Sequence, residues 1–133
     1  MDIIQILKQD YQRFPENQTY SIYTEEVYFK DPMNEFRGRD RYEQTIEFIS
    51  KWFKDVQMDL HDIRRRDNTI ETRWTLHWTA PVPWEPRISI PGTSELKLNR
   101  ESQIISHIDY WDISRLDVLK QLFFPRSPTA GAK

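Results

Sequence analysis

The side chains best suited to chemistry are a carboxylate before a proline and a histidine close to a second carboxylate. Asp31 ends an alternating apolar run that contains Val27 and Phe29, and Pro32 follows it. A proline biases the preceding residue towards an extended backbone, so we expect Asp31 at the last position of a strand. A carboxylate in an apolar pocket has a raised pKa, which suits a general base. The same carboxylate could instead cap the loop that follows it.

His107, Asp109 and Trp111 alternate along one predicted strand, so their side chains are expected to share a face. A histidine two residues from an aspartate can form a polarised acid–base pair or part of a metal site. It can equally be a structural pair at the rim of a sheet. Further metal ligands would have to come from Asp31 or His61, and the sequence has no HxH or HExxH spacing. We therefore expect no metal and no cofactor.

Aromatic side chains are more abundant than a core of this size needs, with five Trp, six Tyr and seven Phe. Such a surplus suits a lined cavity or a dimer face. Tyr11 and Tyr23 offer hydroxyl groups, and Trp74 and Trp84 are candidates for a cavity wall. Trp84 stands in a stiff proline-rich segment that could hold its indole over a pocket mouth. Packing alone, with Trp84 anchoring its loop on the sheet, would account for the same residues.

The composition narrows the class of protein. A chain of 133 residues suits one domain, predicted over 1–124, followed by a disordered tail at 125–133. A net charge of −2 argues against a nucleic-acid partner, and the absence of cysteine excludes disulfides and thiolate sites. No apolar run is long enough to span a bilayer, and no signal-peptide pattern is present. The expected location is the cytoplasm, with no membrane partner.

The periodicity of apolar residues predicts an α+β order of elements. Helical spacing predicts helices over 2–14, 40–53 and 114–123, and alternation predicts strands over 27–30, 56–60, 70–79, 93–99 and 103–111. Asp40 and Glu43 resemble a capping box at the second helix. Four prolines between 80 and 92 predict a loop or a broken edge strand. This order predicts a curved antiparallel sheet with the N-terminal helices packed on its concave face.

The order of elements resembles the nuclear transport factor 2-like (SnoaL-like) superfamily, a cone-shaped α+β fold with a pocket between helices and a bent sheet. Within it, the chain looks like a conserved family of unknown function found in cyanobacteria and plant chloroplasts. The likeness spans about residues 10–112. Its motifs are IY at 22–23, FKDP at 29–32, FRG at 36–38, Tyr42, RW at 73–74, VPW at 82–84, GTSELKLN at 92–99 and IISHIDYWD at 104–112.

Ketosteroid isomerase is an enzyme relative on this fold. The resemblance implies that Asp31 stands at its general base, Tyr11 near its oxyanion-hole tyrosine and Trp111 at its pocket tryptophan. Ser94 falls where that enzyme has a protonated aspartic acid as second donor, and a serine cannot play the same role. Steroid isomerisation is therefore not expected.

Two functions stay open. The first is proton-transfer chemistry of the isomerase, cyclase or dehydratase type, with Asp31 as base and His107 or Tyr11 polarising a carbonyl. The alternative is a non-catalytic ligand-binding, dimerisation or protein-interaction module on the same fold. The expected ligand is a small apolar or amphipathic molecule, and the expected partner is a second copy of the chain. The predicted binding residues are Tyr23, Trp74, Trp84, Ser94, Asp109 and Trp111.

Overall fold

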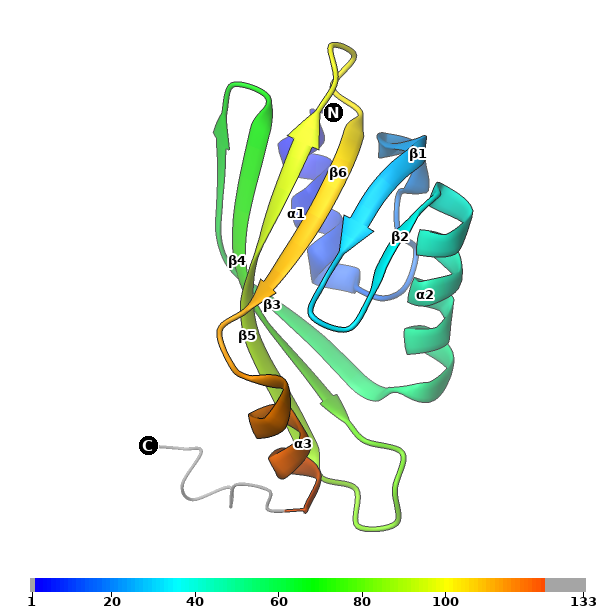
Figure 1. The fold of residues 1–133 in the computed structure, drawn as a ribbon, viewed down its shortest axis with the longest axis vertical. Helices are drawn as coiled ribbons and strands as arrows, with labels where there is room; N and C mark the ends of the chain where they lie inside the picture. The colour runs from blue at the N-terminus through cyan, green and yellow to red at the C-terminus, as the bar shows by residue number, and fades with distance from the viewer. Residues whose placement is uncertain (1, 124–133) are drawn as a thin grey trace.

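The computed structural model describes residues 2–123, and the tail predicted at 125–133 lies outside this range. Within the described residues, three helices pack against one six-stranded sheet (Figure 1). The helices are α1 (Ile3–Arg13), α2 (Arg39–Trp52) and α3 (Arg115–Phe123). The strands are β1 (Tyr23–Lys30), β2 (Glu35–Arg37), β3 (Lys54–Arg66), β4 (Thr69–Thr79), β5 (Arg87–Leu98) and β6 (Ile104–Trp111). One 3-10 turn, Tyr20–Ile22, precedes β1.

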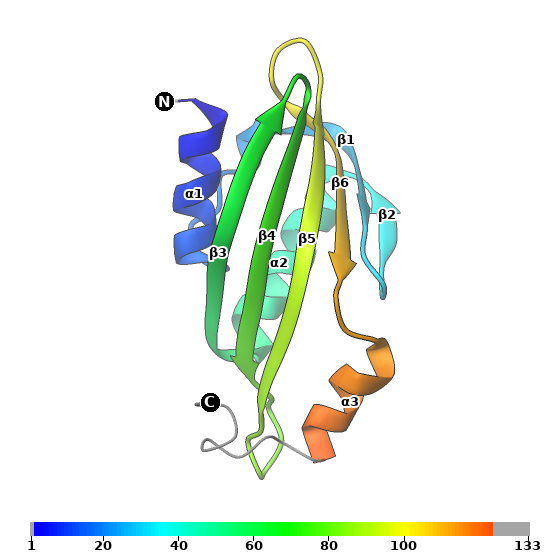
Figure 2. The ribbon, with the colours of Figure 1, turned by 90° about the vertical axis from the view of Figure 1, so that its left-hand side faces the viewer.

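The sheet has the strand order β2-β1-β6-β5-β4-β3. Strands β3 to β6 form the antiparallel run that the sequence predicts. The sheet as a whole is mixed, because β1 lies parallel to β6; the expectation of a wholly antiparallel sheet was wrong at this pair. The short strand β2, in a segment expected to be a loop, pairs with β1. In Figure 2, β3, β4 and β5 face the viewer while α1 and α2 lie beside and behind the sheet, so its outer face is uncovered.

The helix starts follow local capping chemistry in two cases out of three. The Asp2 carboxylate accepts a hydrogen bond from the Gln5 N–H (2.9 Å) at the start of α1. The Ser114 hydroxyl oxygen accepts one from the Asp117 N–H (3.1 Å) at the start of α3, the helix predicted over 114–123. At α2 the N-cap is Gly38, with φ of +117° and no side-chain cap. The predicted capping box was therefore wrong, because the chain enters this helix through a backbone conformation that only glycine adopts easily.

Strand β5 differs from the sequence-based expectation. Residues 87–91 belong to this strand, although Pro91 lies among them. The proline is tolerated because β6 ends opposite Gly92, and the Pro91 carbonyl accepts from the Asp112 N–H (2.8 Å). Beyond that point the Gln121 side chain from α3 replaces the missing strand. It accepts from the Ser89 N–H (2.8 Å) and donates to the Ser89 carbonyl (2.9 Å).

The core consists of two clusters. The larger lies where α1 and α2 meet the sheet and includes Leu7, Val27, Ile46 and Leu96. The smaller contains Trp74, Ala80, Ile88 and Ile90. None of the helices within residues 2–123 is long and apolar enough to cross a membrane.

Candidate functional site

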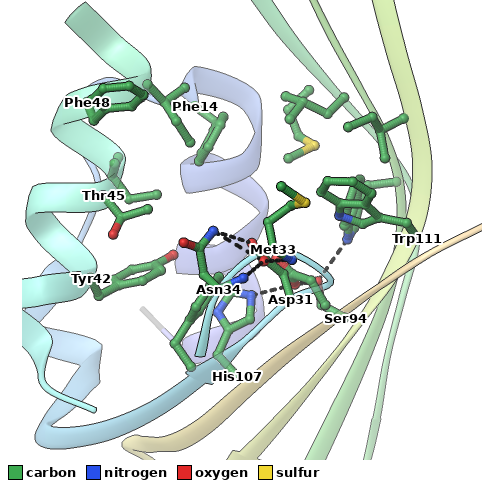
Figure 3. A pocket seen from close by; sticks show the side chains of 18 of the residues that line it. Phe14, Asp31, Met33, Asn34, Tyr42, Thr45, Phe48, Ser94, His107 and Trp111 are labelled. Carbon is green, nitrogen blue, oxygen red and sulfur yellow. Dashed lines mark hydrogen bonds and ion pairs between the residues drawn. The ribbon is translucent and has the colours of Figure 1, made fainter. Parts of the chain in front are cut away.

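A cavity of about 870 Å³ lies on the concave side of the sheet, with residues of both core clusters in its walls. In Figure 3, Tyr42, Thr45 and Phe48 from α2 form one wall and Trp111 from β6 stands on the opposite side. Apolar and aromatic side chains dominate the lining: Leu7, Phe14, Phe29, Ile46, Phe48, Ile49, Phe53, Met58, Leu76, Trp78, Ile90 and Leu96. The polar lining residues include Ser94, His107 and Asp109 on the sheet, and also Gln18, Asp31, Asn34, Arg41, Gln44, Thr45 and Arg115.

The structure brings most of the predicted site residues to this cavity. The predicted residues that line it are Tyr11, Tyr23, Asp31, Trp74, Ser94, His107, Asp109 and Trp111. Strand alternation explains the shared face of the three on β6, and the Asp-Pro pair explains the position of Asp31 at the end of β1.

Trp84 lies elsewhere. Its indole N–H donates to the Leu122 carbonyl of α3, and its ring centroid lies 6.1 Å from that of Phe123. The proline-rich loop is thereby anchored on α3, with the Trp84 side chain half exposed. The expected position over the cavity is corrected accordingly, because the loop folds towards the last helix.

A buried hydrogen-bond chain joins Trp74, Ser94, Asp109 and His107. The Trp74 indole N–H donates to Ser94 Oγ (2.8 Å), and Ser94 Oγ lies 2.5 Å from Asp109 Oδ1. His107 Nε2 lies 2.7 Å from the same carboxylate oxygen. Because an indole N–H can only donate, the Ser94 hydroxyl must use its own proton on Asp109. An ionised Asp109 can only accept, so Nε2 of His107 carries a proton.

The other imidazole nitrogen of His107 takes no part in this hydrogen-bond chain. Nδ1 is buried and has no hydrogen-bond partner among the described residues. The rings of Phe29, Tyr42 and Tyr23 surround the imidazole, with centroids 5.1, 5.7 and 6.2 Å away. A buried polar atom without a partner costs free energy, and such atoms concentrate at functional sites. Nδ1 is therefore a polar atom beside the cavity whose hydrogen-bonding capacity is unused within the described residues.

The tyrosines of the site stay protonated at neutral pH. Tyr11 Oη lies 2.8 Å from Thr72 Oγ1, and burial, followed by the charge of Asp109, raises the pKa of Tyr11 to about 12. The hydroxyl groups of Tyr23 and Tyr42 lie 3.3 Å apart, and burial raises the pKa of both well above its ordinary value. Each of these residues thus offers a neutral hydroxyl group.

Asp31 both caps the loop that follows it and lines the cavity, the two alternatives that the sequence left open. Its Oδ1 accepts hydrogen bonds from the N–H groups of Met33 (2.8 Å) and Asn34 (2.6 Å), so it caps its own loop. It also lines the cavity, where burial raises its pKa against the lowering effect of those hydrogen bonds. Its Oδ2 has only a 3.4 Å contact with the Asn34 side-chain amide. Oδ2 is therefore the oxygen that is available for a proton.

Two further residues of the site were not predicted as site residues. Tyr42 lies on the helix predicted over 40–53, and no pattern in the sequence predicted its contact with His107. Thr72 meets Tyr11 only because α1 crosses the sheet there. Within residues 2–123, no three His, Asp or Glu side chains are grouped so as to hold a metal ion.

Solved structures define the class of fold. A protein with a ketosteroid isomerase-like fold from Catenulispora acidiphila, solved with trimethylamine, matches with a TM-score of 0.74 and 16% identity, over 96% of this chain and 98% of that one. A putative SnoaL-like polyketide cyclase from Jannaschia sp. CCS1 matches with a TM-score of 0.74 and 12% identity, over 92% of each chain. An LEH-like epoxide hydrolase from M. tuberculosis matches with a TM-score of 0.69 and 13% identity, over 90% and 86%. The chain thus has the cone-shaped α+β fold of nuclear transport factor 2-like and SnoaL-like proteins.

The amino-acid sequence identifies the family to which the chain belongs. The pattern described as "Uncharacterized conserved protein (DUF2358)" matches residues 1–107, and the chain belongs to that family. A comparison with curated proteins gave no match.

Proposed function

We propose that this protein binds a small, mainly apolar molecule whose polar end lies against the buried hydrogen-bond chain. The observation that carries this proposal is the cavity itself, whose volume of about 870 Å³ suits a small-molecule ligand. Its walls are mainly apolar, and one group of polar side chains, Ser94, His107 and Asp109, is joined by hydrogen bonds within them. Such a division favours an amphipathic ligand, because burial stabilises the apolar part while hydrogen bonds orient the polar end.

Proteins of the same fold support a role of this kind. Their descriptions include a putative polyketide cyclase and an LEH-like epoxide hydrolase, and one was solved with trimethylamine. These descriptions concern the other proteins. For this chain, the cavity supports the proposal that it too binds a small molecule.

The proposal is tested by calorimetric titration with 2-naphthol, an apolar ring system with one hydroxyl group. Leu76→Trp adds bulk to the cavity wall and should weaken binding roughly tenfold or more, a loss of about 1.4 kcal/mol. Arg73→Trp makes the same change on the opposite face of β4 and should bind as the wild type does. Equal binding by both variants, or no binding by the wild type, would contradict the proposal.

A second candidate function is proton transfer with Asp31 as base. The Oδ2 atom of Asp31 would take a proton from a carbon next to a carbonyl group, and Tyr11 or His107 would hydrogen-bond the oxygen that gains charge. The raised pKa of Asp31 and its place on the cavity support this role. The non-catalytic alternative needs only binding.

Deuterium exchange of 2-tetralone in heavy water, followed by NMR, separates these alternatives. A catalytic Asp31 predicts faster exchange at the carbon next to the carbonyl with the wild type, and no acceleration with Asp31→Asn. Acceleration that survives in Asp31→Asn would rule Asp31 out as the base. If the wild type binds the ketone without any acceleration, the binding module is the better description.

Charge and hydropathy support a cytoplasmic location as part of this proposal. The motifs of the resemblance support a cyanobacterial or plastid origin.

A further inference from the structure

Exposed apolar side chains lie at the mouth of the cavity and on the helices and loop next to it. We call this set the apolar rim: Met33, Phe48, Trp52, Trp84, Leu116, Leu119 and Phe123, each of which is half exposed or more. Met33, Phe48 and Leu119 come from three different elements and line the same cavity. Among the described residues, the other large apolar side chains with comparable exposure are Ile105 and Tyr110 of β6. The exposed apolar surface is therefore concentrated at the mouth and on the parts of α2, α3 and the β4–β5 loop next to it.

Helix α3 supplies one side of the apolar rim. Val118 and Leu122 pack towards the smaller core cluster. Leu116, Leu119 and Phe123 stand three and four residues apart, so they share a different face of the helix, and they are 62%, 53% and 64% exposed. A helix that has already buried one apolar face rarely exposes a second one to water without a partner.

Helix α2 supplies the other side. The ring centroids of Phe48 and Trp52 lie 6.5 Å apart, and the Lys51 ammonium lies 5.3 Å from the centre of the Trp52 ring. On the α3 side, Trp84 lies against Phe123. Tryptophan beside lysine is typical of side chains that lie at the level of lipid headgroups.

Positive charge accompanies the apolar rim. Arg41 and Arg115 line the cavity, and neither forms an ion pair with a carboxylate within residues 2–123. Arg115 donates to the Pro32 carbonyl (3.5 Å), which joins α3 to the β1–β2 loop at the mouth. The Arg41 guanidinium lies 5.1 Å from the ring centre of Phe36. Both guanidinium groups are exposed and suit the phosphate of an anionic lipid.

From this placement we infer that the apolar rim docks on an anionic phospholipid surface, so that the cavity takes its ligand from the bilayer. The inference rests on the proposed function and names the source and class of the ligand, an apolar molecule dissolved in lipid. A bilayer against the apolar rim leaves the mouth open to such a molecule, whereas a second protein chain seated there would cover it. The chain would lie on the surface, as interfacial helices do, and would not span it.

Docking of this kind departs from the sequence-based expectation of no membrane partner. Hydropathy along the chain detects segments that span a bilayer, and it does not detect a surface assembled from separate elements. The apolar rim combines residues from the β1–β2 loop, α2, the β4–β5 loop and α3. Its existence follows only from the tertiary structure.

Vesicle flotation tests the inference, with phosphatidylcholine vesicles that contain or lack phosphatidylglycerol. The wild type should float with the anionic vesicles and less with the neutral ones, and added salt should weaken the binding. The triple variant Trp52→Ser, Leu116→Ser, Phe123→Ser changes rim residues that do not line the cavity. It should lose roughly tenfold or more of the vesicle affinity and keep its binding of 2-naphthol.

Matched controls separate this inference from the proposed function. Leu116→Ser should weaken flotation, whereas Ile105→Ser removes an exposed apolar side chain at the start of β6, outside the apolar rim, and should not. Leu76→Trp should lose 2-naphthol and still float. A wild type that binds 2-naphthol but no vesicles overturns the inference and leaves the proposed function intact. Vesicle binding unchanged in the triple variant also overturns it. A dimer that the triple variant dissociates, without vesicle binding, would instead identify a second copy as the occupant.

Discussion

Asp31 combines a structural and a chemical position in one side chain. One carboxylate oxygen holds the loop through the N–H groups of Met33 and Asn34, and the other lies at the cavity with little hydrogen bonding. Its loop-capping position and its pocket position were alternatives in the sequence, because an Asp-Pro pair is compatible with both. The structure shows that they coexist, since the two oxygens of one carboxylate can face different surroundings.

Asp31→Asn should preserve the loop, because an amide oxygen can accept the same two backbone hydrogen bonds. The raised pKa means that folding favours the protonated carboxyl, so ionisation of Asp31 reduces stability as the pH rises above the ordinary value of 3.8. The variant lacks this ionisation. Urea unfolding should therefore show a variant at least as stable as the wild type at neutral pH, with no such advantage well below pH 3.8. A variant that is less stable only at neutral pH would show that the charge itself stabilises the loop.

The buried hydrogen-bond chain begins at the Trp74 indole N–H, which can only donate. The Ser94 hydroxyl therefore donates in turn to Asp109. Trp74→Phe removes the indole N–H that donates to Ser94 Oγ and leaves that oxygen without this donor. We expect a loss of about 1–3 kcal/mol in the free energy of unfolding, measured by chemical denaturation. Trp111→Phe serves as the control, because Trp111 is half buried on the cavity wall and should cost less. A smaller loss for Trp74→Phe than for Trp111→Phe would contradict this account.

At the scale of elements, β5 shows how one strand serves two neighbours. Along most of its length β5 lies between β4 and β6. Near its start, where β6 has ended, the Gln121 side chain from α3 forms the hydrogen bonds to the Ser89 backbone that a neighbouring strand would form. Four prolines nearby predicted a break, yet the strand continues because Pro91 falls where β6 has ended. Gly92, next to it, lies beneath Trp74, so a close approach between strand and indole accounts for this glycine.

Gly92→Ala is the sharpest test of that packing. A Cβ at this position would lie 2.6 Å from the Tyr110 carbonyl oxygen and 2.7 Å from the Trp74 ring, closer than van der Waals contact permits. The strand or the indole would have to move, at a cost of about 1–3 kcal/mol or more. Thr93→Ala, at the next position of the strand, is the control. If the free energy of unfolding of Gly92→Ala lies within about 0.5 kcal/mol of the wild-type value, the strand and the indole can move apart at little cost, which would contradict this account.

At the scale of the whole molecule, the sheet has two unlike faces. The concave face holds the cavity, and the outer face is uncovered (Figure 2). That outer face carries a second set of hydrogen-bonded polar side chains, in which His77 lies 3.0 Å from Asp59 and 2.7 Å from Ser89. Polar chemistry thus dominates it, with Ile108 and Tyr110 as apolar members by strand alternation.

Dimerisation through this outer face is the proposal that follows from the sequence-based expectation of a second copy. Light scattering coupled to gel filtration should give twice the chain mass of 16.2 kDa. Tyr110→Arg should then return the protein to the monomer, because a charge would be buried at the interface. A wild-type monomer at micromolar concentration would exclude this assembly.

Local patterns along the chain were enough to predict much of the site. Alternation in β6 placed His107, Asp109 and Trp111 on one face, and the Asp-Pro pair placed Asp31 at the end of β1, because side-chain direction in a strand repeats every two residues. Three helices and the antiparallel run of four strands also followed from period and turn chemistry. The resemblance supplied the cone-shaped class, which the solved structures confirm.

Tertiary structure alone decided which of these side chains meet. The parallel pairing of β1 with β6 joins strands separated by most of the chain, and the register of β5 against β6 sets Ser94 opposite Asp109. A shift of one residue in that register would turn Ser94 away from the cavity. The apolar rim, likewise, exists only where separate elements converge. Periodicity reports which way each side chain points along its own element, whereas contact between elements depends on long-range packing that no local pattern records.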